Sequence, residues 1–104
     1  MFIKKGRLMR KLSAIRFKPK PECFDKFVAA SKEFSRDTGT ANPPTYYIMT
    51  CKDEVFHVMI RDSDTINENI ENGVSWLDSQ RHLLQEYNEI DRHTLPVTGD
   101  LVEY

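Results

Sequence analysis

The clearest structural signal in the sequence is residues 45–61, TYYIMTCKDEVFHVMIR. Both halves of this stretch are rich in β-branched and aromatic residues, which favour strands. Lys52 and Asp53 interrupt them, so the stretch predicts two antiparallel strands, 45–51 and 54–61, joined by a tight turn. Side chains alternate between the two faces of a strand, and both faces of this hairpin carry large apolar residues.

The sequence before the hairpin predicts a strand and a helix. Residues 8–18 place apolar side chains on both faces, which is typical of a strand covered on both sides. Pro19 ends this strand, and Pro21 suits the first turn of a helix. Apolar residues then recur at helical spacing, and Gly39 suits the left-handed conformation that often ends a helix. The first helix is therefore expected over residues 21–37.

The sequence after the hairpin predicts helical segments and a last strand. Residues 62–75 are expected to form a short helix. Ser75 and Asp78 have the spacing of a capping box, and a stripe of apolar residues follows them. The second long helix is therefore expected over 76–90, and residues 95–103 are expected to form the closing strand.

The expected order of elements, β-α-β-β-α-β, predicts an α+β, ferredoxin-like domain. Such a chain forms a four-stranded antiparallel sheet with both helices on one face. The uncovered face should then be polar in a monomer, yet large apolar side chains occupy it. Leaving them in water would forgo about 1.5–3 kcal/mol each and would expose a patch that soluble monomers avoid. We therefore expect a homodimer in which two open sheet faces meet about a two-fold axis.

Composition and charge restrict the class of protein. The 104 residues suit one domain, and 39% apolar with 30% charged residues is typical of a globular chain. Residues 1–7 are expected to be a flexible basic N-terminus, and residues 8–104 the single domain. The net charge of −1 gives no overall attraction for nucleic acid. No membrane span and no signal peptide are recognisable, so a cytoplasmic location is expected.

Three segments carry a family resemblance: residues 15–27, which begin IRFKP and end FDKF; residues 75–79, SWLDS; and residues 98–104, TGDLVEY. The first is similar to an opening strand, Lys-Pro turn and amphipathic helix, the second to the Trp-containing start of a second long helix, and the third to a closing strand. Together they resemble the antibiotic-biosynthesis monooxygenase (ABM) family of the dimeric α+β barrel superfamily. The resemblance covers most of the chain.

This resemblance implies a function. Members of the family are homodimers, and many oxidise aromatic polyketides or quinols with molecular oxygen, without flavin or metal. It therefore implies a cofactor-independent monooxygenase, an oxidoreductase that acts on a small aromatic, polyketide or quinol-like compound. A haem-cleaving subset uses an Asn on the first strand, a Trp and a His in the second long helix. Trp76 matches the Trp, but the Asn and the His have no counterpart here, so haem cleavage is not expected.

Chemistry of this kind needs a base that removes a proton and a dry pocket that holds the resulting anion. Histidine is the simplest base near neutral pH. His57 is the first candidate, because it lies in mid-strand between apolar residues; the alternative is a buried histidine whose hydrogen bonds are satisfied. His82, in the expected second long helix, is the second candidate. The pocket is expected between the sheet and the helices.

Four residues are candidates for binding the substrate. Trp76 is expected either to stack on an aromatic substrate or to anchor its helix on the sheet, and it can do both. Tyr46 and Tyr47 point to opposite faces, so one of them is expected to reach the pocket. Arg16 lies in mid-strand and is expected to bind an anionic substrate or to pair with an acid on the neighbouring strand.

Two other functions stay open. The first is a non-catalytic dimeric module of the same fold that binds a small apolar ligand in a pocket with no titratable group. The second is a binder of nucleic acid or anionic surfaces that uses residues 4–20, and its affinity would fall steeply with salt. The sequence has no Gly-rich phosphate loop and no clustered Cys or His at metal-ligand spacing, so neither a cofactor nor a metal is expected.

Overall fold

The computed structural model describes residues 10–39, 43–63 and 66–103, and for residues 66–69 the backbone alone. The elements are strand β1 (Arg10–Phe17), 3-10 helix η1 (Pro21–Cys23), helix α1 (Phe24–Arg36), strands β2 (Thr45–Cys51) and β3 (Glu54–Asp62), helix α2 (Ile66–Gln80), 3-10 helix η3 (Arg81–Leu83) and strand β4 (Thr94–Asp100). The predicted flexible N-terminus, residues 1–7, lies outside the described residues.

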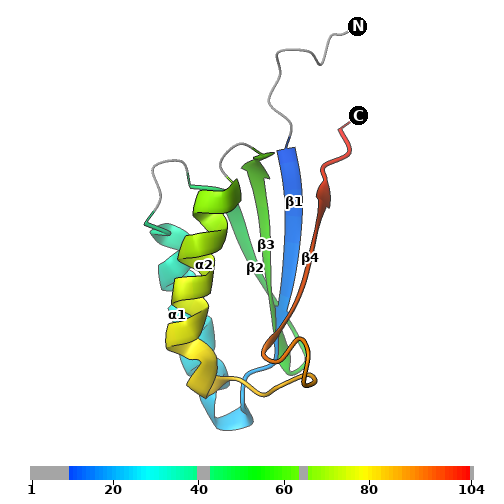
Figure 1. Cartoon of the computed structure of the whole chain (residues 1–104). Helices are drawn as coiled ribbons and strands as arrows, with labels where there is room; N and C mark the ends of the chain where they lie inside the picture. Colours follow the sequence, from blue (N-terminus) through cyan, green and yellow to red (C-terminus); the bar gives the residue numbers. More distant parts are fainter. Residues whose placement is uncertain (1–9, 40–42, 64–65, 104) are drawn as a thin grey trace, which may run out of the picture.

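The four strands form one sheet in the order β2-β3-β1-β4. All three neighbouring pairs are antiparallel, and His57 on β3 lies opposite Ile15 on β1 and Ile48 on β2. Figure 1 shows α1 and α2 side by side on one side of this sheet. The prediction of an α+β, ferredoxin-like domain is therefore confirmed.

The hairpin of β2 and β3 has the predicted bounds within one residue. Lys52 in its turn has a φ of 57°, a left-handed conformation that allows the tight reversal. Burial along β3 alternates strictly, with every second side chain buried against the helices. The buried side chains are Val55, His57, Met59 and Arg61. This alternation positions one histidine and one arginine on the inner face of the sheet.

Helix α1 covers that inner face as its sequence predicts. Phe27 and Ser31, one helical turn apart, are fully buried. The helix begins with the 3-10 turn that contains Pro21, and Gly39 after it has a φ of 77°. The Gly39 amide donates a hydrogen bond of 3.0 Å to Oδ1 of Asp37. The turn at Pro21 and the left-handed Gly39 therefore mark the two ends of the helical segment, close to the predicted range of 21–37.

The chain between the hairpin and β4 differs from the prediction. A single helix, α2 (Ile66–Gln80), replaces the expected short helix over 62–75 and the expected long helix over 76–90. After η3 the chain leaves the helical conformation, and Ile90 is 92% exposed. Trp76 thus lies in the second half of α2, not at its start. Among the described residues no helix is long and apolar enough to cross a membrane.

Tertiary hydrogen bonds explain why the helix ends early. The Lys20 amide donates to the Leu83 carbonyl, and the Gln85 amide donates to the Lys18 carbonyl, each at 2.8 Å. The segment after α2 therefore pairs with the segment after β1. The chain changes from the 3-10 helix η3, which ends at Leu83, to the extended conformation at Leu84, and the two neighbours both enter the core. In a continuing helix they would point about 100° apart, and only one could be buried so fully.

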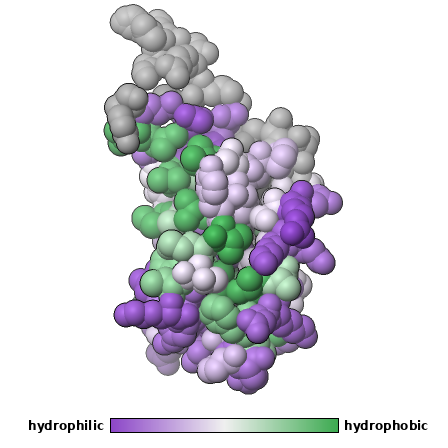
Figure 2. All heavy atoms as spheres, turned by 180° about the vertical axis from the view of Figure 1, so that it is seen from behind, coloured by the Kyte–Doolittle hydropathy of each residue, from purple (hydrophilic) through white to green (hydrophobic). Residues whose placement is uncertain are grey.

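The other face of the sheet is apolar and uncovered. We call it the apolar sheet face, and it comprises Leu12, Ala14, Tyr47, Met49, Phe56, Val58, Ile60, Leu95 and Val97, which share one side by register. Tyr47 is 58% exposed and Val97 is 66% exposed. In the rear view of Figure 2, apolar side chains gather along the side of the molecule that carries the sheet, and hydrophilic ones gather mainly on the helix side and at the lower end.

Candidate functional site

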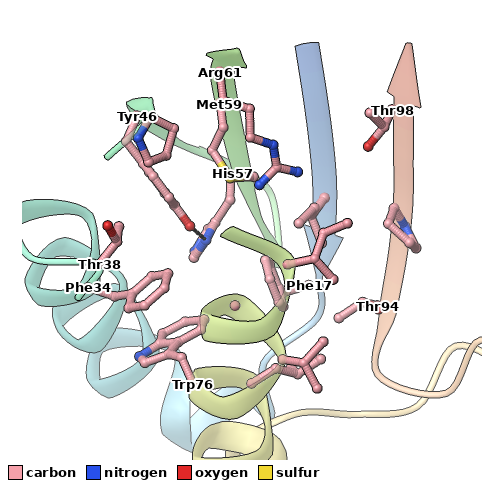
Figure 3. Close-up of a pocket in the computed structure, with 17 residues that line it drawn as sticks. Phe17, Phe34, Thr38, Tyr46, His57, Met59, Arg61, Trp76, Thr94 and Thr98 are labelled. Atoms are coloured by element: carbon pink, nitrogen blue, oxygen red, sulfur yellow. Dashed lines mark hydrogen bonds between the residues drawn. The ribbon is translucent and has the colours of Figure 1, made fainter. Parts of the chain in front are cut away.

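A cavity of about 300 Å³ lies between the inner face of the sheet and the two helices (Figure 3). Its volume lies at the lower end of the range of small-molecule sites. The described lining residues are Ile15, Phe17, Phe34, Thr38, Pro44, Tyr46, His57, Met59, Arg61, Ile70, Gly73, Val74, Trp76, Leu77, Thr94, Pro96 and Thr98. Most are apolar, and the titratable ones are Tyr46, His57 and Arg61. The site therefore combines an apolar wall with a few polar groups on β2 and β3.

Aromatic rings form the helical wall of the cavity. The indole of Trp76 stacks on Phe34, with ring centroids 4.8 Å apart and an interplanar angle of 16°. The Phe17 ring is nearly perpendicular to the same indole, with ring centroids 6.2 Å apart, and the Phe27 centroid lies 5.7 Å from that of the indole. These contacts fix the indole between α1 and the sheet. A flat aromatic compound would find complementary ring faces and edges here.

His57 lies at the centre of a hydrogen-bonded chain. Its Nδ1 is 2.6 Å from the Tyr46 hydroxyl, and its Nε2 is 2.8 Å from Oγ of Ser31. The side chain is 1% exposed, and the Phe17 ring centroid lies 4.5 Å from the imidazole centroid. Burial lowers the pKa of His57 to about 3. The imidazole is therefore neutral at physiological pH, with one nitrogen as donor and the other as acceptor.

The hydrogen-bonded series of Tyr46, His57 and Ser31 is suited to donating a hydrogen bond to a ligand, and poorly suited to removing a proton from it. Both ring nitrogens of His57 have partners, and a neutral imidazole of so low a pKa accepts a proton poorly. Burial also raises the pKa of Tyr46 above its ordinary value, so its hydroxyl keeps its proton. Tyr46 lines the cavity. When Nδ1 of His57 carries the imidazole proton, the Tyr46 hydroxyl accepts that hydrogen bond and keeps its own proton to donate to a bound oxygen atom.

Arg61 is a functional candidate that the sequence analysis missed. It is 8% exposed, and its Nη2 donates a hydrogen bond of 2.9 Å to Oγ of Ser13. That oxygen is 2.7 Å from Oγ1 of Thr98, so Ser13 holds one side of the guanidinium and Thr98 holds Ser13. The alternation along β3 could have revealed it, because residues 55, 57, 59 and 61 share one face.

The structure brings three of the predicted residues together. Tyr46, His57 and Trp76 all line the cavity, and the centroids of His57 and Trp76 are 5.3 Å apart. Tyr46 is hydrogen-bonded to His57, as described above. Strand alternation and the helix face position all three.

The structure does not bring the other three into this cavity. Tyr47 projects from the apolar sheet face. Arg16 on that face forms a bidentate pair with Glu54, with Nε–Oε1 and Nη2–Oε2 distances of 3.0 and 2.8 Å. This is the neighbouring-strand alternative stated for Arg16. His82 is exposed in η3. In the part of the chain that the structure describes, no three His, Cys, Asp or Glu side chains converge on a metal site.

Comparison with known proteins identifies the fold. No family model and no curated protein matches the chain. Among solved structures, a crystal structure from Chloroflexus aurantiacus J-10-fl, described as a “putative Antibiotic biosynthesis monooxygenase”, superposes with a TM-score of 0.65 and 13% sequence identity. The match covers 91% of this chain and 95% of the other. The chain therefore has the ferredoxin-like fold of that protein, with an aromatic cavity between its sheet and its helices.

Proposed function

We propose that the protein is a cofactor-independent monooxygenase that oxidises a small aromatic, polyketide or quinol-like compound with molecular oxygen. The observation that carries this proposal is the cavity of about 300 Å³ in which an aromatic wall faces the Tyr46–His57 pair. The fold shared with a protein described as a monooxygenase supports it. The apolar lining would exclude water from the reaction, and Tyr46 would donate a hydrogen bond to an oxygen of the substrate.

The reaction balances without a further reductant. An activated methylene between aromatic rings becomes a ketone: CH2 and O2 give C=O and H2O. One oxygen atom enters the substrate and the other leaves as water with the two methylene hydrogens. The four electrons that reduce O2 come from the substrate carbon. The part of the protein is to bind the ionised substrate, hold its oxygen and keep water away.

The test is oxygen consumption with a panel of anthrones and hydroquinones. We expect uptake above the uncatalysed rate for at least one compound, with one O2 consumed per ketone formed and no release of hydrogen peroxide. The partnered nitrogens of His57 favour the alternative, a non-catalytic dimeric small-ligand-binding module. Calorimetric binding of panel members without any oxygen uptake would establish that alternative.

Replacement of Tyr46 by Phe tests the proposed donor. The change removes the hydroxyl that contacts Nδ1 of His57 at 2.6 Å and keeps the ring. We expect kcat/KM for oxygen uptake to fall at least about tenfold, because a preorganised donor to a developing oxyanion is lost. Tyr87→Phe is the matched control, since its hydroxyl bonds to Glu54 and it is not among the lining residues. Equal rates for both variants would remove Tyr46 from the mechanism.

We also propose that the protein is a homodimer closed by the apolar sheet face. Tyr47, Met49 and Val97 are each about half exposed or more, at 58%, 48% and 66%. Covering such a face with a second copy would remove it from water and would satisfy two-fold symmetry. The basic residues 4–20 and nucleic acid play no part in this proposal.

Replacement of Met49 by Glu tests the dimer. The side chain is 48% exposed in the single chain, so the monomer should tolerate a carboxylate there, whereas two copies would bury it in their interface. We expect sedimentation equilibrium to show about 24 kDa for the wild type, twice the 12.2 kDa of one chain, and about half of that for the variant. Ala29→Glu, at an exposed position of α1, is the control. A wild type that sediments as a 12.2 kDa particle would refute the proposal.

A further inference from the structure

We propose that the cavity takes its ligand as an anion, namely a small aromatic compound whose ionised carboxyl, phenol or enol oxygen binds the guanidinium of Arg61. This inference rests on the proposed function in so far as it takes the cavity as the substrate site. It adds the class of substrate: a compound that carries its negative charge when it enters.

The first argument is the state of the Arg61 side chain. The residue is 8% exposed, and its Nε lacks a hydrogen-bond partner among the described residues. Its Nη2 donates a hydrogen bond to a neutral hydroxyl, that of Ser13. A buried cation without an anion is costly, and burial indeed lowers the pKa of Arg61. Figure 3 shows the side chain on the cavity side of β3.

The second argument is the contrast with the other arginines. Of the five other arginines in the described part of the chain, four pair with a carboxylate within 4 Å: Arg10 with Glu103, Arg16 with Glu54, Arg81 with Asp78 and Arg92 with Glu86. These pairs are all more exposed than Arg61. The fifth, Arg36, is exposed to water, which solvates its charge. The described lining of the cavity contains no Asp or Glu. Among the described lining residues, Arg61 is thus a cation that no carboxylate neutralises, and it is available to an anionic ligand.

The third argument is the weakness of the available base. His57 has partners on both ring nitrogens, and its pKa of about 3 makes it a poor proton acceptor at neutral pH. A substrate that is already ionised needs no strong base in the cavity. An arginine is then the appropriate recognition group, because its planar fork of donors matches two oxygens or one delocalised oxyanion.

The shape of the cavity supports the same orientation. Trp76 and Phe34 offer a stacked aromatic wall on the helical side, and Arg61 and Tyr46 offer their donors from the sheet side. An aromatic ring would lie against the indole while its ionised oxygen faces β3. Ser13 holds the guanidinium in place and is itself held by Thr98, so both are positioning residues.

The experiment compares two pairs of aromatic probes of matched shape by titration calorimetry at pH 7. The first pair is 2-naphthoate and 2-naphthamide, and the second is 2,4-dinitrophenolate and 2,4-dinitroanisole. For the wild type we expect the anion of at least one pair to bind about tenfold or more tightly than its neutral partner. A preference in the first pair assigns the site to carboxylates, and one in the second pair assigns it to phenolates.

Variants of Arg61 test whether its guanidinium binds the negative charge of the probe. We expect Arg61→Met to abolish the preference for the anion, Arg61→Lys to keep part of it, and Arg36→Met, an exposed arginine of α1, to keep it fully. Equal affinity for both members of each pair, no binding of any probe, or a preference that survives in Arg61→Met would each overturn the inference. The wild-type comparison decides the matter even where an Arg61 variant does not fold.

This outcome is separable from that of the proposed function. A preference for anions without oxygen uptake leaves the inference intact and refutes the monooxygenase. Oxygen uptake with neutral substrates and no preference for anions refutes the inference alone.

Discussion

Replacement of Phe27 by Ala is expected to lower the free energy of unfolding by about 3–5 kcal/mol, the usual cost of removing a buried aromatic ring. Phe27 is 0% exposed, and its ring lies 5.1 Å from Phe17 and 5.7 Å from Trp76. Residues of both helices and of the sheet surround this ring. The cavity left by its removal therefore cannot close unless a helix or a strand moves. A loss of this size is a large part of the total stability of a small domain.

Urea denaturation followed by far-ultraviolet circular dichroism measures this loss. We expect a lower midpoint with an unchanged slope, since the surface exposed on unfolding stays nearly the same. Phe24→Ala is the matched control, because Phe24 lies on the same helix but is only partly buried. The control should lose clearly less than Phe27→Ala. A smaller loss for Phe27→Ala than for Phe24→Ala would contradict the packing described here.

Acidification is expected to destabilise the protein well before its carboxylates titrate. The pKa of His57 is about 3 in the folded state, below the ordinary value of 6.5 for histidine, because burial disfavours the imidazolium. The unfolded chain therefore binds a proton near pH 6.5 that the folded chain takes up only near pH 3. Stability is fully present above pH 6.5 and falls by about 1.4 kcal/mol per pH unit below it.

Denaturation midpoints between pH 7 and pH 5 measure this slope, and His57→Gln tests its origin. Glutamine does not titrate, so the variant should lose about one proton of the pH dependence in addition to any loss of stability at pH 7. His93, whose pKa is lowered by burial and by Arg81, contributes in the same direction. The slope should therefore shrink without vanishing. An unchanged slope in His57→Gln would mean that His57 binds a proton equally in both states.

Much of the fold can be predicted from the sequence where local signals agree. The hairpin of β2 and β3 follows from strand alternation, because each face has a consistent apolar pattern over seven to nine residues. Helix α1 follows from its apolar spacing and from the positions of Pro21 and Gly39. In both regions the tertiary contacts reinforce what the local sequence favours.

The end of α2 could not be predicted in the same way. Ser75 and Asp78 have capping-box spacing, but they lie inside the helix, and the apolar residues after them suggested that a helix continued to residue 90. What ends the helix is pairing with residues 18–20, more than 60 positions away along the chain. A local pattern contains no information on such a contact. Leu83 and Leu84 gave a local hint, since two consecutive side chains of a helix point about 100° apart and are rarely both buried so fully.

The candidate site was predictable in part. Alternation places His57 and one of the two tyrosines toward the helices, and a lone tryptophan at helical spacing is a natural wall residue. The same alternation includes Arg61, but a charged residue at a strand end is ordinarily exposed, so its burial was not expected. Ser31 was also missed as the partner of His57, because that contact joins a helix to a strand 26 residues later.

Among the described residues that line the cavity, the titratable ones belong to the hairpin of β2 and β3. Tyr46 and Arg61 lie near the open end of this hairpin, and His57 lies closer to its turn. The aromatic wall comes mainly from other parts of the chain. The titratable groups and the aromatic rings that shape the cavity therefore lie in different parts of the chain. Residues 45–62 could thus be exchanged as one contiguous segment. Such an exchange would change the polar groups of the cavity and would leave unchanged the helices that form its opposite wall.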